Sequence, residues 1–185
     1  MNGVLFVDRA RINFITRTAL FIALTVVFQF IGRSIPGEVG SFITGPLVNC
    51  CIFVSTALLG VWGGVIVSVL APFSSIINNH APIAGILILF TPFIAVGNAI
   101  LAVCFNWLNK KNVYLSVVAA SALKFAFLAA SINMFIKINT QKDVQEFTGK
   151  LVRLFTWPQL LTALVGGFIA IAVIKRLEKA WQNNR

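Results

Sequence analysis

Apolar residues occupy most of the chain in six long runs, which short polar segments separate. The runs cover approximately residues 14–31, 42–59, 61–77, 84–108, 113–136 and 154–174. A helix rises about 1.5 Å per residue, so about 20 residues cross about 30 Å of hydrocarbon. The pattern therefore predicts one domain over residues 1–185, an all-α membrane protein with six transmembrane helices.

Glycine, proline and polar residues indicate where turns, kinks and loops are expected. The sequence GVWGG at residues 60–64 predicts a tight turn between the second and third runs. Pro72 lies inside the third run, so we expect a kink or break there, and the run could be partly re-entrant. Residues 137–153 form the longest polar segment and are predicted to be a loop.

Composition and charge support the membrane assignment. The chain is 58% hydrophobic and 11% charged, with a mean hydropathy of +0.91, whereas soluble domains carry about 25% charged residues. The net charge of +10 follows from basic residues at the ends of the runs and does not indicate a nucleic-acid partner. Six spans place nine basic residues on the side of the termini and five on the other, which predicts that both termini are cytoplasmic.

One cation lies in the middle of a predicted span. Lys124 is the midpoint of the fifth run, where an ammonium group costs about +2.5 to +3.5 kcal/mol. At helical spacing it shares a narrow, small and polar face with Ser116, Ala120 and Ser131. We expect this face to point inward to a partner, a cavity or an anionic or carbonyl-bearing ligand. Bonding to backbone carbonyls and snorkelling to an interface are the alternatives.

Other polar and aromatic residues are candidates for the same binding site. Asn98 lies at a depth similar to that of Lys124, and Gln159 and Thr162 lie in the outer half of the sixth run. Trp157 either stacks on a ligand ring or belongs to an interfacial tryptophan belt. His80, in the loop after the third run, either caps the pocket or is simply solvated. Residues 33–41 form a candidate lid.

The chain lacks the usual signals of catalysis. It has no phosphate-binding loop of the type GxxxxGK[ST], and none of its five acidic residues lies within a predicted span. Its three cysteines form no CxxC pair, so we expect neither a metal site nor a cofactor. We therefore expect the protein not to be an enzyme.

The first run contains TALFIALTVVF, in which Ala19 and Ala23 form an AxxxA pair that allows close approach of another helix. The chain combines this alanine pair with the glycine turn in ALLGVWGGVIVSVL, a length of 185 residues and six predicted spans. In this combination it resembles the substrate-binding S components of energy-coupling factor (ECF) vitamin transporters. The resemblance covers residues of about 14–176.

The resemblance implies a function and partners. S components capture a vitamin or related micronutrient outside bacterial or archaeal cells. They work with a transmembrane T component and two cytoplasmic ATPases that drive uptake. The resemblance implies that Ala19 and Ala23 contact the T component, and that the pocket is built by the loop after the first helix and by the fourth to sixth helices. The alternatives are a stand-alone secondary carrier or channel for a small organic solute, and a structural protein without a ligand.

Overall fold

The computed structural model describes residues 9–35, 39–74, 84–139 and 142–183, and in these ranges it is helical without strands. Among the described residues, five helices are long and apolar enough to cross a membrane. Two short helices lie between the fourth and the last of the long ones. The helices are α1 Arg9–Arg33, α2 Val39–Ser74, α3 Ala84–Asn109, α4 Val113–Ile138, α5 Lys142–Glu146, α6 Thr148–Phe155 and α7 Trp157–Asn183.

The long helix α2 reverses direction at Gly60. This glycine has φ 76° and ψ −176°, a backbone conformation that other residues rarely adopt. A Cβ atom built on Gly64 would overlap Thr56 Oγ1, although eight residues of straight helix would separate the two positions by about 12 Å. The two halves of α2 therefore fold back on each other, and the reversal lies at the predicted glycine turn. Helical backbone continues through Pro72 to Ser74, so no break occurs at the proline.

The prediction of a loop over residues 137–153 is wrong. The segment contains the end of α4, the short helix α5 and most of α6. Val144, Leu151 and Phe155 are buried in a cluster with apolar residues of α3 and α4, while the charged side chains between them are exposed. Each short helix thus buries an apolar face. The segment as a whole is polar, so its composition does not reveal this face.

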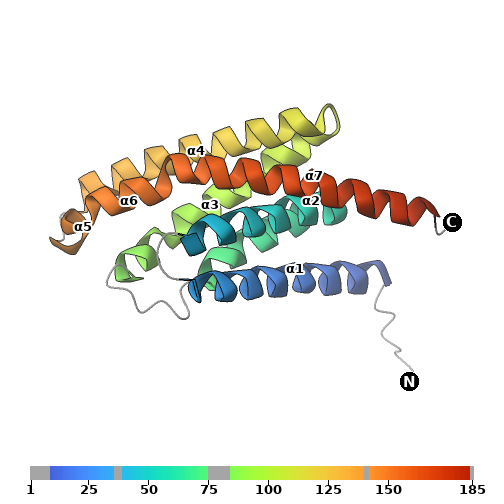
Figure 1. Cartoon of the computed structure of the whole chain (residues 1–185), viewed down its shortest axis with the longest axis horizontal. Coiled ribbons are helices and arrows are strands. Elements are labelled where there is room, and N and C mark those ends of the chain that lie inside the picture. The colour runs from blue at the N-terminus through green and yellow to red at the C-terminus, as the bar shows by residue number, and fades with distance from the viewer. Residues whose placement is uncertain (1–8, 36–38, 75–83, 140–141, 184–185) are drawn as a thin grey trace, which may run out of the picture.

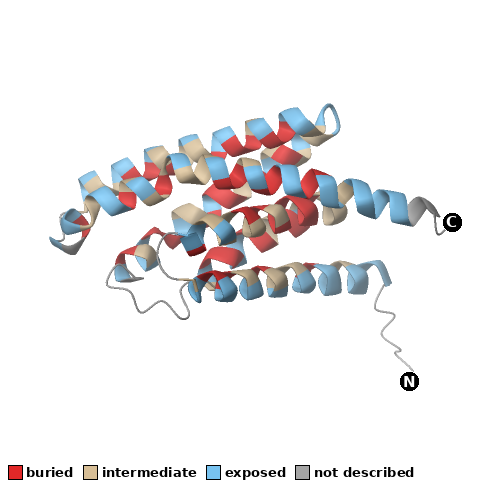
Figure 2. Ribbon diagram, in the orientation of Figure 1, coloured by how far each residue is buried: buried red, intermediate tan, exposed pale blue. Residues whose placement is uncertain are grey.

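The helices form an elongated bundle in which α1 begins and α7 ends at the same end, and α5 and α6 lie at the opposite end (Figure 1). Two apolar clusters fill it. One packs α2, α3, α4 and α7 around Phe53 and Phe105, and the other packs α3, α4 and α6 around Phe90. Helix α1 is the least embedded: 11% of its most apolar window is buried, against 33–50% for the other long helices (Figure 2).

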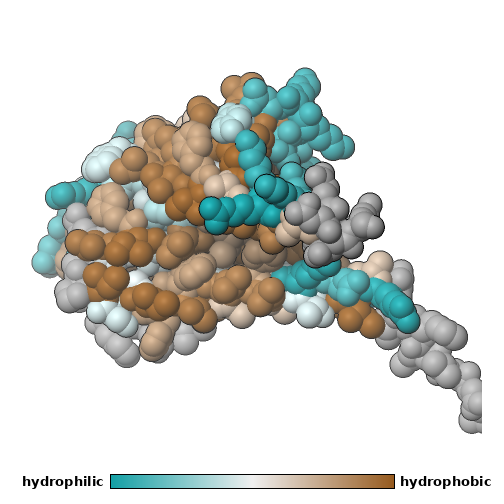
Figure 3. All heavy atoms as spheres, turned by 45° about the vertical axis from the view of Figure 1, so that its right-hand side comes forward, coloured by the Kyte–Doolittle hydropathy of each residue, from teal (hydrophilic) through white to brown (hydrophobic). Residues whose placement is uncertain are grey.

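Large apolar side chains also cover much of the outer surface. Figure 3 shows a broad hydrophobic surface with hydrophilic side chains gathered at its margins. A soluble monomer rarely exposes such a large apolar area, whereas hydrocarbon solvates it. The arrangement is that of a multi-pass membrane protein.

Candidate substrate site

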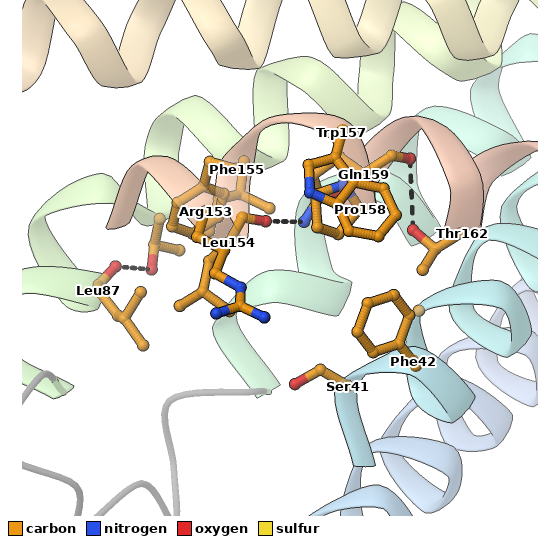
Figure 4. A pocket seen from close by; sticks show the side chains of 13 residues that line it. Ser41, Phe42, Leu87, Arg153, Leu154, Phe155, Trp157, Pro158, Gln159 and Thr162 are labelled. Carbon is orange, nitrogen blue, oxygen red and sulfur yellow. Dashed lines mark hydrogen bonds between the residues drawn. The ribbon is translucent and has the colours of Figure 1, made fainter. Parts of the chain in front are cut away.

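A cavity of about 260 Å³ lies toward the end of the bundle that carries α5 and α6. It is enclosed by the first turns of α2, the first half of α3 and the junction of α6 with α7 (Figure 4). Its lining residues are Ser41, Phe42, Gly45, Leu87, Thr91, Ile94, Arg153, Leu154, Phe155, Trp157, Pro158, Gln159 and Thr162. The predicted residues Trp157, Gln159 and Thr162 therefore meet in one cavity.

Two aromatic rings form part of the cavity wall. The ring centroids of Phe42 on α2 and Trp157 on α7 are 6.1 Å apart, with an interplanar angle of 42°. Trp157 is 54% exposed, so much of its indole surface remains available for contact. The pair offers an apolar surface against which a flat ring can pack.

The junction of α6 and α7 is shaped by Pro158. Proline has no N–H, so the carbonyl of Leu154 lacks the donor that residue 158 of a regular helix would supply. The Gln159 side chain replaces it: Nε2 donates to Leu154 O at 3.3 Å. The chain between the two helices bends at Thr156, which has φ −108° and ψ −123°. The amide of Gln159 is thereby fixed in the cavity wall, and its Oε1 has no hydrogen bond within the described part of the chain.

The inner boundary of the cavity is a close contact between α2 and α7. A Cβ atom on Gly45 would lie 2.9 Å from Thr162 Cβ, so glycine is needed for the helices to approach this closely. Thr162 donates its hydroxyl proton to Gln159 O at 3.3 Å. One turn deeper, the position of Cβ on Gly166 lies 2.9 Å from Asn49 Cβ, so the same close packing continues inward.

Lys124 faces the bundle interior at this deeper level. Its Nζ donates to Asn49 Oδ1 at 2.7 Å, and the two side chains are each 3% exposed. Ser116, Ala120 and Ser131 are buried on the same face of α4, as the helical spacing predicts. The partner of the ammonium group is thus an amide oxygen of α2, and Lys124 is not among the residues that line the cavity. Its predicted contact with substrate stays a prediction.

The remaining predicted site residues lie elsewhere. Asn98 is buried between α3 and the second half of α2, where Ser68 Oγ donates to Asn98 O at 3.0 Å and Asn98 Nδ2 donates to Ser68 O at 3.5 Å. It does not line the cavity, and its Oδ1 has no partner in the described ranges. His80 lies outside the described residues. Of the candidate lid, Arg33 ends α1 and residues 39–41 begin α2, so these parts are helical. Ser41 lines the cavity, and residues 36–38 lie outside the described residues.

Ala19 and Ala23 lie on the outer surface of α1. Both are exposed, and they are surrounded by exposed large apolar residues of the same helix. These neighbours include Leu20, Val26 and Val27. The small residues therefore do not pack against another helix within the described part of the chain.

Several site residues escaped the sequence analysis. Phe42 and Gly45 looked like ordinary span residues, and Arg153 was assigned to a loop. Asn49 could have been identified from the sequence, because its side-chain amide lies within an apolar run and, like that of Asn98, needs a hydrogen-bond partner. The sequence could not show that its partner is Lys124, 75 residues away.

The comparisons with known proteins agree with this architecture. A family model for the ECF transporter, substrate-specific component, matches residues 13–178, which is nearly the whole chain. Searches among curated proteins and among solved structures find no match. The helical bundle with its cavity and the match over residues 13–178 lead to one conclusion: the chain belongs to the family of substrate-specific components of ECF transporters.

Proposed function

We propose that the protein captures a vitamin or related micronutrient at the outer face of a bacterial or archaeal cell membrane for ATP-driven uptake. The observation that carries this proposal is the cavity of about 260 Å³ between α2, α3 and the α6–α7 junction. Ligand pockets for drug-sized molecules measure about 300–1,000 Å³, so a cavity of this size fits a small metabolite. A T component and two cytoplasmic ATPases complete the transporter in this proposal.

The proposed topology has six membrane crossings and cytoplasmic termini. The two halves of α2 supply two crossings, and α1, α3, α4 and α7 supply the others. Basic residues gather where α3 meets α4 and at the end of α7, the side that the positive-inside rule assigns to the cytoplasm. The cavity lies toward the opposite end and opens outward in this arrangement.

The proposed substrate contacts are Trp157, Gln159 and Thr162, which line the cavity. Lys124 is proposed to support the site from one turn below through its bond to Asn49. Asn98 and His80 remain proposed members of the substrate site. The exposed alanine pair of α1, Ala19 and Ala23, is the proposed contact with the T component.

The test is to identify the small molecule that the protein retains. The protein is purified in mild detergent and denatured, and released compounds are identified by mass spectrometry. We expect one stoichiometric vitamin-like compound from the wild type. Ser41→Trp places a large side chain at the exposed rim of the cavity and should abolish retention, whereas Ile43→Trp changes an exposed residue outside the lining and should not. Equal retention by both variants would contradict the assigned site.

A further inference from the structure

The described residues that line the cavity supply both hydrogen-bond donors and acceptors, but they carry charge of one sign only. Among the described residues of the lining Arg153 alone is ionisable, and a guanidinium donates five N–H groups and accepts none. The indole of Trp157 also only donates. Thr91 and Thr162 have given their hydroxyl protons to Leu87 O and Gln159 O, so their oxygens can only accept hydrogen bonds from a ligand.

The charge of Arg153 restricts the charge of the substrate. A cationic substrate in this cavity would lose hydration and would lie close to a group of like charge. A carboxylate or phosphate would instead meet the planar fork of Arg153, which suits two parallel hydrogen bonds. Arg153 also has an interaction within the protein, and a guanidinium with five N–H donors can make more than one contact.

The apolar part of the lining restricts the shape of the substrate. Phe42 and Trp157 form a tilted pair on one side, and Leu87, Ile94 and Pro158 add further apolar surface. The indole face of Trp157 is partly exposed, and Trp157 and Arg153 line the same cavity. A flat ring packed against Trp157 can therefore place a substituent near the guanidinium.

We propose that the substrate is an anionic ring compound, with its carboxylate or phosphate bound by Arg153 and its ring packed against Trp157 and Phe42. This inference rests on the proposed function, namely capture of a small metabolite in this cavity, and it specifies the chemical class.

The experiment offers the protein a mixture of metabolites, so that the protein itself selects the compound that it binds. Detergent-purified protein is incubated with the dialysable fraction of yeast extract, exchanged into clean buffer and denatured, and enriched compounds are quantified by liquid chromatography and mass spectrometry. The wild type should enrich compounds that contain a ring and are anionic at neutral pH. Enrichment of a cationic, neutral or acyclic compound would overturn the assignment, and it would leave the proposed capture function intact.

Variants of two exposed cations on α6 test the role of Arg153. Arg153→Gln should lower retention about 10- to 100-fold, because hydrogen bonds to a charged group contribute binding free energy of that size. Arg153→Lys should recover part of it, because it restores the charge without the fork. Lys150→Gln removes an exposed charge three residues away that does not line the cavity, and it should retain as much as the wild type.

Two outcomes would contradict the proposal in different ways. Undiminished retention by Arg153→Gln would show that the anion is not bound there, while capture itself would stand. Enrichment of no compound by the wild type would contradict the capture function and the substrate class with it. Because the wild-type selection already identifies the class, the test does not depend on the folding of any variant.

Discussion

The buried contact between Lys124 and Asn49 gives a prediction that can be worked from the structure. The ammonium group lies 2.7 Å from the amide oxygen, and both side chains are almost fully removed from solvent. Asn49→Leu keeps the side-chain volume and leaves the ammonium without its amide partner. Leaving a buried charge without its hydrogen-bond partner costs more than the about 1–3 kcal/mol typical of a neutral group. Lys124→Met leaves a neutral amide oxygen without a partner, which costs about 1–3 kcal/mol.

The double variant separates this interaction from simple packing damage. With both groups replaced, neither an unpaired charge nor an unpaired amide remains, so the double variant should be more stable than Asn49→Leu alone. The assay is unfolding in mixed micelles with increasing denaturing detergent. Asn133→Leu is the control, because Asn133 is exposed on α4 and bonds only to Ala129 O in its own helix. It should change the free energy of unfolding by less than about 0.5 kcal/mol.

Additive losses would refute this reasoning. If the double variant lost the sum of the two single losses, the two residues would not be energetically coupled. If Asn49→Leu cost less than Lys124→Met, the buried charge would have another partner of greater importance.

Further predictions concern backbone, partner and substrate. Gly60→Ala should lower the free energy of unfolding by about 1–3 kcal/mol, because φ 76° and ψ −176° are essentially confined to glycine, whereas Gly149→Ala on α6 meets open space and should not lower it in the same assay. Ala23→Leu should preserve substrate retention and reduce co-purification with the T component. Ala122→Leu, on an exposed face of α4, should reduce neither. Lys124→Met should weaken substrate retention, and retention equal to wild type would contradict its predicted role in the site.

The membrane helices were predictable because their signal is large and local. Each apolar run must avoid water along its whole length, so composition alone locates it. The reversal at Gly60 was also predictable, since glycines mark positions where other residues are strained. The helices over residues 142–155 were not, because a short amphipathic helix and a polar loop have similar composition. Only the burial of Val144 and Leu151 distinguishes them.

The sequence allowed individual polar residues to be singled out, but not the contacts that they make with one another. A lysine or an amide within an apolar run must find a partner, so Lys124 and Gln159 could be singled out from the sequence. Their neighbours depend on how the helices pack. The glycine at residue 45 allows α2 to approach Thr162, and this contact separates the cavity above from the Lys124–Asn49 pair below. No local pattern contains that information.

The most direct test of the account is whether substrate binding is sensed by Trp157. The chain has four tryptophans, and replacing Trp62, Trp107 and Trp181 by phenylalanine leaves Trp157 as the only one. This variant is titrated with the compound that denatured wild-type protein releases, and tryptophan fluorescence is recorded beside calorimetric binding. The account predicts a saturable change in emission that is complete at one equivalent. Stoichiometric binding by calorimetry with unchanged emission from Trp157 would contradict it.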